Sequence, residues 1–303
     1  MRVLVTGANG YVGRAVVKAL SLVGHDPVAM VRSHGGDVSG ASAIRVADLL
    51  DRQSLRRAVE GVDAVCHLAG LTRARESFAN PIRYFEVNTA GTIALLDAMN
   101  RAGVHQIVFA STGAIYGSPD RQPMTEDLPS APPHPYASSK LAAELAIEAQ
   151  CGTGDLAAVV VRLLNVAGGD DGDPTRLVPR ILAAITNNSD FAVNGNGTAV
   201  RDYLHIADAA DAFAASVDHL PAAGQVATYN VGSGSGSSVA EVIAAAERVT
   251  GQHVSVVRRP AAAEPQVLIS DPSRAIVELE WEPRRSSIDT IVGDAWAAMP
   301  AAQ

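Results

Sequence analysis

The chain has 303 residues, of which 48% are hydrophobic and 4% aromatic, and its formal net charge at pH 7 is −8. A chain of this length can bury roughly 75% of its unfolded surface, which is enough for a large core and two lobes. The acidic balance, without any block of basic residues, argues against nucleic acid or an anionic membrane as the main partner. The composition therefore favours an α/β protein with a small-molecule ligand.

Membrane and export signals are not evident. The uninterrupted apolar runs are about five to eight residues long, whereas a helix that crosses a bilayer needs about 18 or more. A first strand predicted at residues 3–5 leaves no room for a secretion signal. The cysteines, Cys66 and Cys151, are too few for a disulfide framework and fit a reducing compartment. We therefore expect a cytoplasmic protein without a membrane partner.

Aliphatic and β-branched runs alternate with helical periodicity through the first half of the chain. Strands are predicted at 3–5, 27–31, 44–46, 64–68, 107–110 and 158–164. Helices are predicted at 12–23, 54–60, 81–101 and 136–151, the third with Asn80 as its cap and Pro81 at its first position. The alternation predicts an α/β fold with a Rossmann-type doubly wound parallel sheet and helices on both faces.

The texture of the sequence changes after Asn165, where loops rich in Gly, Asp and Asn at 168–173 and 187–197 separate short helices. We place a domain boundary there. Residues 1–165 are expected to form an NAD(P)-binding Rossmann domain, and residues 166–303 a smaller mixed α/β C-terminal substrate domain. Some C-terminal segments are expected to return to the first domain. A loop at 232–238 is predicted to precede a helix that starts at Val239.

A glycine-rich turn follows the first predicted strand and opens the first predicted helix. Gly7 suits a tight turn, Gly10 a close approach to a pyrophosphate, and Gly13 close packing of the helix. The helix N-terminus then faces the phosphates. An ordinary glycine turn is the alternative, but the strand-turn-helix context favours a dinucleotide site. The same turn carries Asn9, Tyr11 and Val12, which we also assign to the cofactor.

The choice between NAD and NADP depends on the end of the second predicted strand. The acidic residue that would hold the adenosine ribose of NAD is missing at Val31. Arg32 can instead grip the 2′-phosphate of NADP, or lie on the surface against the adenine. NADP therefore stays open at this point. Asp48 and Leu49 follow the third predicted strand and are expected beside the adenine.

Tyr136 and Lys140 lie four residues apart at the start of a predicted helix, so their side chains share one face. The chain has only two lysines, Lys18 and Lys140, which makes this spacing informative. A neighbouring ammonium favours the phenolate, so Tyr136 becomes a usable acid or base near neutral pH. An exposed Tyr–Lys pair without a chemical role is the alternative.

Two hydroxyls stand at the carboxyl end of another predicted strand. Ser111 and Thr112 occupy the edge where ligands of doubly wound sheets bind, and can hold the reacting oxygen. Turn formation by side-chain-to-backbone hydrogen bonds is the alternative. Beside the Tyr136 and Lys140 pair we favour the chemical role, which predicts redox chemistry on a hydroxyl group.

Together, the glycine turn, the two hydroxyls and the Tyr136 and Lys140 pair resemble the extended short-chain dehydrogenase/reductase family along essentially the whole chain. Within that family the sequence is most similar to the UDP-galactose (UDP-glucose) 4-epimerases. Segments similar to their cofactor-lining segments are 67–71, 75–77 and 88–92, and segments similar to their substrate-binding segments are 162–166, 195–198 and 201–205.

The resemblance implies an NAD-dependent UDP-sugar 4-epimerase, an isomerase of carbohydrate metabolism. In it Tyr136 takes the proton of the sugar 4-hydroxyl while hydride passes to bound NAD, and the 4-keto intermediate rotates and receives hydride on its other face. Thr112 holds the 4-oxygen, and Lys140 holds the nicotinamide ribose and tunes Tyr136. A homodimer through the helices at 81–101 and 136–151 is also implied, and no metal is expected.

The resemblance also assigns residues to the two ligands. Beyond the glycine turn, those for the cofactor are Arg32, Asp48, Leu49, Leu68, Ala69, Gly70, Asn88, Ser111, Tyr136 and Lys140. Those for the UDP-sugar are Ser111, Thr112, Tyr136, Asn165, Arg176, Leu177, Arg201 and Glu264.

Several positions depart from the family pattern. Gly113 and Ala114 stand where the family's dehydratases carry an Asp–Glu pair, which argues against a 4,6-dehydratase. A basic residue is missing at Thr72, and Leu268 stands at the position that limits the bulk of the sugar. The C-terminal arginine of the epimerase pattern falls on Ala261, so pyrophosphate binding would depend on Arg201 with Arg176, Arg258 or Arg259.

Two other functions remain. An NADP-dependent reductase of a nucleotide-linked keto sugar would share the fold and the reacting residues, and would suit Arg32. A cofactor-sensing binding protein without turnover would need a damaged site, whereas the Tyr136, Lys140 and Thr112 set is complete. The sugar, the nucleotide base and the oligomeric state stay open.

Overall fold

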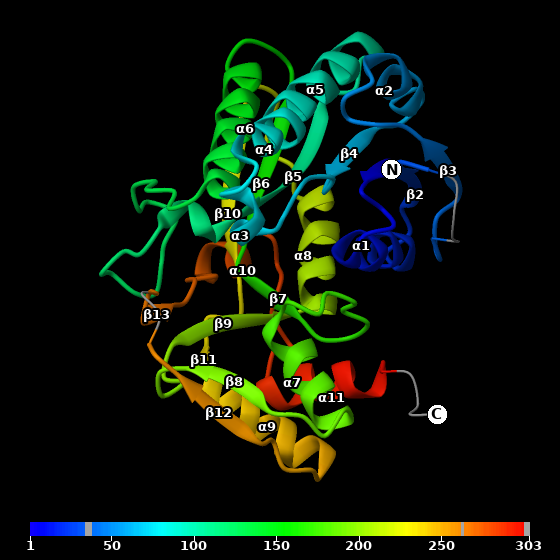
Figure 1. The fold of residues 1–303 in the computed structure, drawn as a ribbon. Helices are drawn as coiled ribbons and strands as arrows, with labels where there is room; N and C mark the ends of the chain where they lie inside the picture. The colour runs from blue at the N-terminus through cyan, green and yellow to red at the C-terminus, as the bar shows by residue number, and fades with distance from the viewer. Residues whose placement is uncertain (34–37, 262–263, 300–303) are drawn as a thin grey trace.

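A parallel sheet forms the centre of the larger lobe in the computed structural model of the protein, which describes residues 1–33, 38–261 and 264–299 (Figure 1). Its strand order is β10-β6-β5-β4-β1-β2-β3, and every neighbouring pair is parallel. The strands are β1 (Arg2–Thr6), β2 (Asp26–Val31), β3 (Ala43–Val46), β4 (Ala64–His67), β5 (Gln106–Thr112), β6 (Ala157–Leu163) and β10 (Val226–Val231).

Helices cover both faces of this sheet because alternate strand residues point to opposite sides. In β1, Val3 and Val5 join one core cluster and Leu4 joins the other. On the first side pack α1 (Tyr11–Leu22) and α8 (Ile206–Asp218), which lie next to each other in Figure 1. On the second side pack α2 (Arg52–Ala58), α5 (Gly91–Ala102) and α6 (Pro135–Cys151). The Rossmann-type doubly wound α/β fold predicted from the sequence is therefore confirmed.

The helix predicted at 81–101 is built from three pieces: α4 (Pro81–Tyr84), the π-helical turn η1 (Phe85–Ala90) and α5. Asn80 and Pro81 occupy the N-cap and the first turn as predicted, but the Asn80 side chain makes no capping hydrogen bond. Asn80 has φ −136° and ψ 56°, outside the extended conformation that lets a capping side chain reach back. The π turn sets Asn88 against α6, where its Nδ2 donates to Ser139 Oγ at 3.0 Å.

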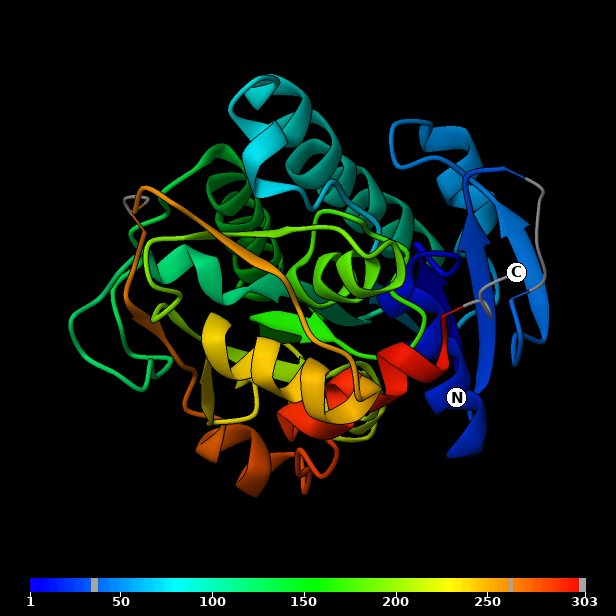
Figure 2. The same cartoon turned by 60° about the horizontal axis from the view of Figure 1, so that its bottom comes forward.

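The smaller lobe has short strands and three helices around a third core cluster, seen from below in Figure 2. Ser238 begins α9 with a reciprocal capping box to Glu241, so the predicted helix start at Val239 is confirmed. The loop predicted at 232–238 is only partly correct, because residues 236–238 form strand β11 against β9. The elements of this lobe are β7 (Asn165–Ala167), α7 (Leu177–Thr186), β8 (Phe191–Asn194), β9 (Val200–His205), β11 (Gly236–Ser238), α9 (Val239–Thr250), β12 (Val256–Arg259), β13 (Val267–Leu268) and α11 (Ile288–Ala297).

Segments from the C-terminal half also contact the large sheet. Strand β10 pairs with β6, and α8 packs against α1. The remaining short elements are α3 (Ala74–Ser77), η2 (Gly113–Tyr116) and α10 (Ser273–Glu278), and α10 packs next to β10. A division of the chain at residue 165 stays a prediction.

The carboxyl ends of the central strands meet at one edge of the sheet, because Thr6 is in register with His67 and Thr112 with Leu163. Strand β4 ends one residue earlier than predicted. The amides of Leu68 and Ala69 donate to the Thr6 hydroxyl oxygen, at 3.1 and 3.0 Å, instead of to a neighbouring strand. A side chain of β1 therefore shapes the loop at the site.

None of the helices in the described part of the chain is long and apolar enough to cross a membrane. In the same residues both cysteines, Cys66 and Cys151, are buried free thiols.

Candidate active site

The glycine-rich turn between β1 and α1 is packed as tightly as its sequence predicts. Gly7 has φ +68°, and a Cβ there would lie 2.9 Å from the Ala69 amide nitrogen. A Cβ on Gly13 would lie 2.1 Å from the Gly7 carbonyl oxygen. Gly10 begins α1, and among the described residues no side chain caps this helix start. The first-turn N–H groups of α1 are thus suited to an anion such as a pyrophosphate.

A cavity of about 320 Å³ opens in front of this turn. Its wall combines the turn with the carboxyl ends of β2, β3 and β4, so it brings together segments that are far apart in the sequence. The predicted cofactor residues in its lining are Gly7, Asn9, Gly10, Tyr11, Val12, Gly13, Arg32, Asp48, Leu49, Leu68, Ala69 and Gly70. A cavity lined by a glycine turn and an uncapped helix start fits a dinucleotide.

Asn88, also predicted at the cofactor, is 1% exposed and supports the cavity wall. Its Oδ1 accepts from the Leu71 amide at 2.8 Å, and its Nδ2 donates to the Leu71 carbonyl at 3.0 Å. A Cβ on Gly70 would lie 2.9 Å from Asn88 Oδ1. Asn88 therefore fixes the loop after β4 to the helices behind it.

Tyr136 lies in the first turn of α6, where Pro135 takes a first-turn position and His134 caps the helix through Nδ1, which accepts from the Ala137 amide at 3.1 Å. The Tyr136 ring stacks on His134 with centroids 5.8 Å apart, and meets the edge of Tyr84 at 6.3 Å. The sequence prediction did not include His134. Its position directly before the helix-starting Pro135 was the sequence signal that could have identified it.

Lys140 lies one turn further along α6 and is 4% exposed. Its Nζ is 4.3 Å from the centre of the Phe109 ring and close to the backbone of Gly70. Burial lowers the pKa of Lys140 to about 8, although the Glu144 carboxylate acts in the opposite direction. The ammonium is therefore partly titratable near neutral pH.

The prediction that Lys140 makes Tyr136 acidic is not what the structure shows. Burial raises the pKa of Tyr136, a hydrogen bond with Thr112 and the charge of Arg176 lower it, and Tyr84 raises it further. Lys140 is not among the groups that set it, because its ammonium lies over the Phe109 ring. The groups of this protein that favour the phenolate are thus Thr112 and Arg176.

The two predicted hydroxyls have different surroundings. Thr112 begins η2, accepts from the Ala114 amide at 3.2 Å and is also hydrogen-bonded to Tyr136. Ser111 donates to the carboxylate of Glu144, which is 1% exposed. Glu144 forms a salt bridge with Arg162, with Nη2 and Oε2 2.6 Å apart. Glu144 was missed from the sequence, although its place one helical turn after Lys140 was a signal.

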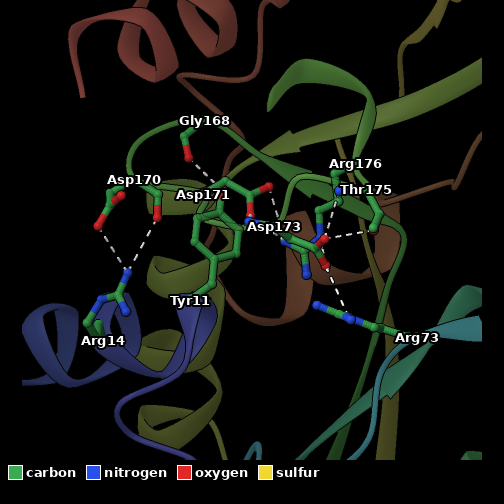
Figure 3. A network of polar contacts seen from close by, with 9 residues as sticks. All are labelled: Tyr11, Arg14, Arg73, Gly168, Asp170, Asp171, Asp173, Thr175 and Arg176. Carbon is green, nitrogen blue, oxygen red and sulfur yellow. Dashed lines mark hydrogen bonds and ion pairs between the residues drawn. The ribbon is translucent and has the colours of Figure 1, made fainter. Parts of the chain in front are cut away.

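A loop from the smaller lobe lies over the glycine-rich turn (Figure 3). The Tyr11 hydroxyl donates to the Gly168 carbonyl at 2.5 Å, and Arg14 is 3.3 Å from the carboxylate of Asp170. Arg176 is 3.2 Å from Asp171, and its guanidinium lies 5.1 Å from the centre of the Tyr11 ring. Arg176, predicted for the substrate, thus lines the cofactor cavity as well.

Arg201 and Glu264, both predicted at the substrate, lie together, with Nη2 and Oε2 3.0 Å apart. Asn165 starts β7, and its Nδ2 donates to the Asp202 carbonyl at 3.1 Å. Leu177 begins α7 directly after Arg176. A second cavity of about 320 Å³ is lined in part by Arg75, Arg180 and Arg259. Of the arginines proposed for the pyrophosphate, Arg259 borders this second cavity.

Comparison with known proteins extends over both lobes. A sequence model of the NAD dependent epimerase/dehydratase family matches residues 3–232. A UDP-glucose 4-epimerase from Streptomyces lividans is 36% identical over 313 residues, which cover 97% of this chain and 94% of that protein.

Solved structures agree with this result. The UDP-glucose 4-epimerase from Brucella ovis in complex with NAD is 32% identical with a TM-score of 0.92, covering 98% of this chain and 97% of that one. The UDP-glucose-4-epimerase from Stenotrophomonas maltophila with bound NAD and formylated UDP-arabinopyranose is 31% identical, with the same TM-score and coverage.

Proposed function

The chain belongs to the NAD dependent epimerase/dehydratase family, and we propose that it is a nucleotide-sugar 4-epimerase of the UDP-glucose/UDP-galactose type. One observation carries this proposal most directly. Thr112 ends β5 and is hydrogen-bonded to Tyr136, and Lys140 lies close to Gly70 in the wall of the cofactor cavity, in a chain that is similar to UDP-glucose 4-epimerases from end to end. The enzyme is an isomerase that acts on a UDP-sugar.

NAD is the cofactor. Solved relatives that match both lobes hold NAD, and the glycine turn and cavity of this chain fit it. When bound, NAD supplies the group that takes a hydride from the sugar carbon and returns it. Arg32 is exposed beside the cavity, where we assign it to the adenine instead of to a 2′-phosphate. The NADP-dependent reductase is not favoured, because the relatives named above are epimerases.

The reacting residues have complementary tasks. Tyr136 exchanges one proton with the sugar 4-oxygen, and it is restored at the end of each cycle because the proton returns. Thr112, whose own oxygen accepts from the Ala114 amide, donates its proton to the same sugar oxygen. Lys140 places a positive charge behind the nicotinamide site and holds the ribose. Without an acidic pair at Gly113 and Ala114, the site lacks the groups for dehydration.

The smaller lobe holds the nucleotide. We assign Arg201 to the diphosphate, with Glu264 and Asn165 at its side and Leu177 at the start of α7. Arg176 lies between the two ligands, since it borders the cofactor cavity and its charge lowers the pKa of Tyr136. Ser111 lies between the nicotinamide and the sugar. The diphosphate gives Arg176 a second anionic partner beside Asp171.

A homodimer and a cytoplasmic location complete the proposal. Large apolar side chains are exposed on the segments that we expect to pair, with Ile82 70%, Ile93 45% and Leu145 56% exposed. A second copy of the chain would cover them in a four-helix contact. The buried free thiols of Cys66 and Cys151 suit the reducing cytoplasm.

The test is incubation of the purified protein with UDP-glucose, UDP-N-acetylglucosamine or UDP-glucuronate without added cofactor. An epimerase carries its NAD through each cycle, so the 4-epimer of at least one substrate forms catalytically. A reaction that runs only with stoichiometric NADPH and yields a reduced sugar would contradict the proposal and favour the reductase.

A further inference from the structure

A row of buried polar side chains runs behind the reacting residues, away from the cofactor cavity. Ser111 donates to Glu144, and Glu144 accepts from Arg162 through Nη2 at 2.6 Å and Nε at 3.3 Å. Arg162 Nη1 donates to the Tyr116 hydroxyl oxygen at 2.8 Å, and Tyr116 donates to Asn230 on β10, also at 2.8 Å. The row thus connects the end of β5 with the far edge of the sheet.

Burying this ion pair is not expected to add much to the stability of the fold. Glu144 is 1% and Arg162 is 8% exposed, and replacing a buried ion pair by apolar side chains is often neutral or stabilising. Burial disfavours the charge on Arg162, but Glu144 raises the pKa of Arg162 above its usual range. Arg162 is in register with Ser111 on the neighbouring strand, so the charges are held directly behind the site.

The hydrogen bond to Glu144 decides what Ser111 can do. A serine hydroxyl has one proton, and Ser111 uses it on the carboxylate, so toward the cavity it can only accept. Thr112 has the opposite polarity, because its oxygen accepts from the Ala114 amide and its proton is directed at the reacting Tyr136 hydroxyl. The two neighbouring hydroxyls are thereby set as one acceptor and one donor.

The same carboxylate acts on Lys140. Glu144 follows Lys140 by one helical turn, and its charge raises the pKa of Lys140 against the effect of burial. The other groups around this pair are Arg162 on β6, Glu148 on the next turn of α6, and His67 on β4. His67 is uncharged near neutral pH, because burial and Lys140 lower its pKa to about 3.

We propose that Glu144 is a positioning residue of the epimerase reaction: it fixes the Ser111 hydroxyl as a hydrogen-bond acceptor and places a negative charge one helical turn from the Lys140 ammonium. Arg162 holds the carboxylate in place through the salt bridge between Nη2 and Oε2. This role rests on the proposed function, since it acts through residues assigned there to the nicotinamide and the sugar.

Glu144→Gln tests the role, because glutamine keeps the size and can still accept from Ser111 but has lost the charge. The proton of Lys140 is then released at lower pH, so the alkaline limb of kcat moves to lower pH by about one unit or more. The kcat at pH 8 falls about tenfold, and KM for the UDP-sugar is little changed. Glu148→Gln is the matched control: it removes an exposed carboxylate from the next turn of α6, and its limb stays where the wild type has it.

A second variant guards against loss of the fold, since Glu144→Gln leaves Arg162 without its partner. Glu144→Gln with Arg162→Met removes both charges together, which buried pairs tolerate better than the loss of one partner. The same shift of the alkaline limb is expected. An unshifted limb in a folded variant overturns the inference, and so does failure of both variants to fold, because Glu144 would then serve the fold alone. Absence of epimerisation in the wild type would instead refute the proposed function.

Discussion

Lys140→Met is expected to make the protein more stable while it destroys activity. Burial holds the pKa of this lysine near 8 instead of 10.5, and each pKa unit corresponds to about 1.4 kcal/mol. Keeping the ammonium in the folded protein at pH 7 therefore costs about 3 kcal/mol, an upper bound on what methionine recovers. Methionine fills similar space over the Phe109 ring without a charge.

The stability difference between the two proteins is expected to depend on pH. Wild-type protein releases the Lys140 proton near pH 8 when folded and near pH 10.5 when unfolded, so the unfolded state binds more protons between these values. Wild-type stability therefore rises over that range, and the advantage of the methionine variant disappears. The cost is fully present below pH 8.

Urea unfolding of both proteins, freed of cofactor, at several pH values measures the difference. Lys18→Met is the matched control, because Lys18 is the other lysine of the chain and is exposed on α1. That control should change the free energy of unfolding by less than about 0.5 kcal/mol at every pH. A Lys140→Met protein that is less stable than wild type at pH 7, or a difference independent of pH, would refute the reasoning.

Three further changes test other parts of the structure. Thr112→Val keeps the shape but removes the donor to the sugar oxygen, so steady-state assays should show kcat about 10²-fold lower with KM little changed; an unchanged kcat would rule out that donor role. Gly13→Ala places a methyl group 2.1 Å from the Gly7 carbonyl oxygen, so the purified protein should lose bound NAD and melt at a lower temperature, and full retention of NAD would contradict this packing. Leu145→Arg puts a charge in the expected dimer contact, so sedimentation should show monomers; an intact dimer would place the interface elsewhere.

Six of the seven strands of the sheet were predictable because they are short aliphatic runs between helical segments, whereas β10, which comes from the C-terminal half and pairs with β6, was not predicted. The glycine turn was predictable because its close packing admits only glycine: Gly7 and Gly13 meet backbone atoms that leave no room for a Cβ. Element ends were less predictable. The cap at Asn80 and the end of β4 depend on backbone angles and on the Thr6 hydroxyl, which local sequence does not fix.

The sequence predicted several residues of the site, but it did not predict how their charges act on one another. The spacing of Tyr136 and Lys140 places them on one face of α6, but it could not reveal that the ammonium lies over Phe109. Glu144 and Arg162 come from different elements, and only the register of β5 and β6 brings Arg162 behind Ser111. A charged residue within the otherwise apolar strand β6 was the available sign of this pair.

The most direct test of the proposed chemistry compares wild type with Tyr136→Phe for conversion of UDP-galactose into UDP-glucose without added cofactor. Phenylalanine keeps the ring between His134 and Tyr84 and removes only the group that exchanges the proton. We predict that kcat falls about 10²- to 10⁴-fold while the content of bound NAD stays the same. A Tyr136→Phe protein that epimerises at the wild-type rate would contradict the assignment of this phenol as the acid and base.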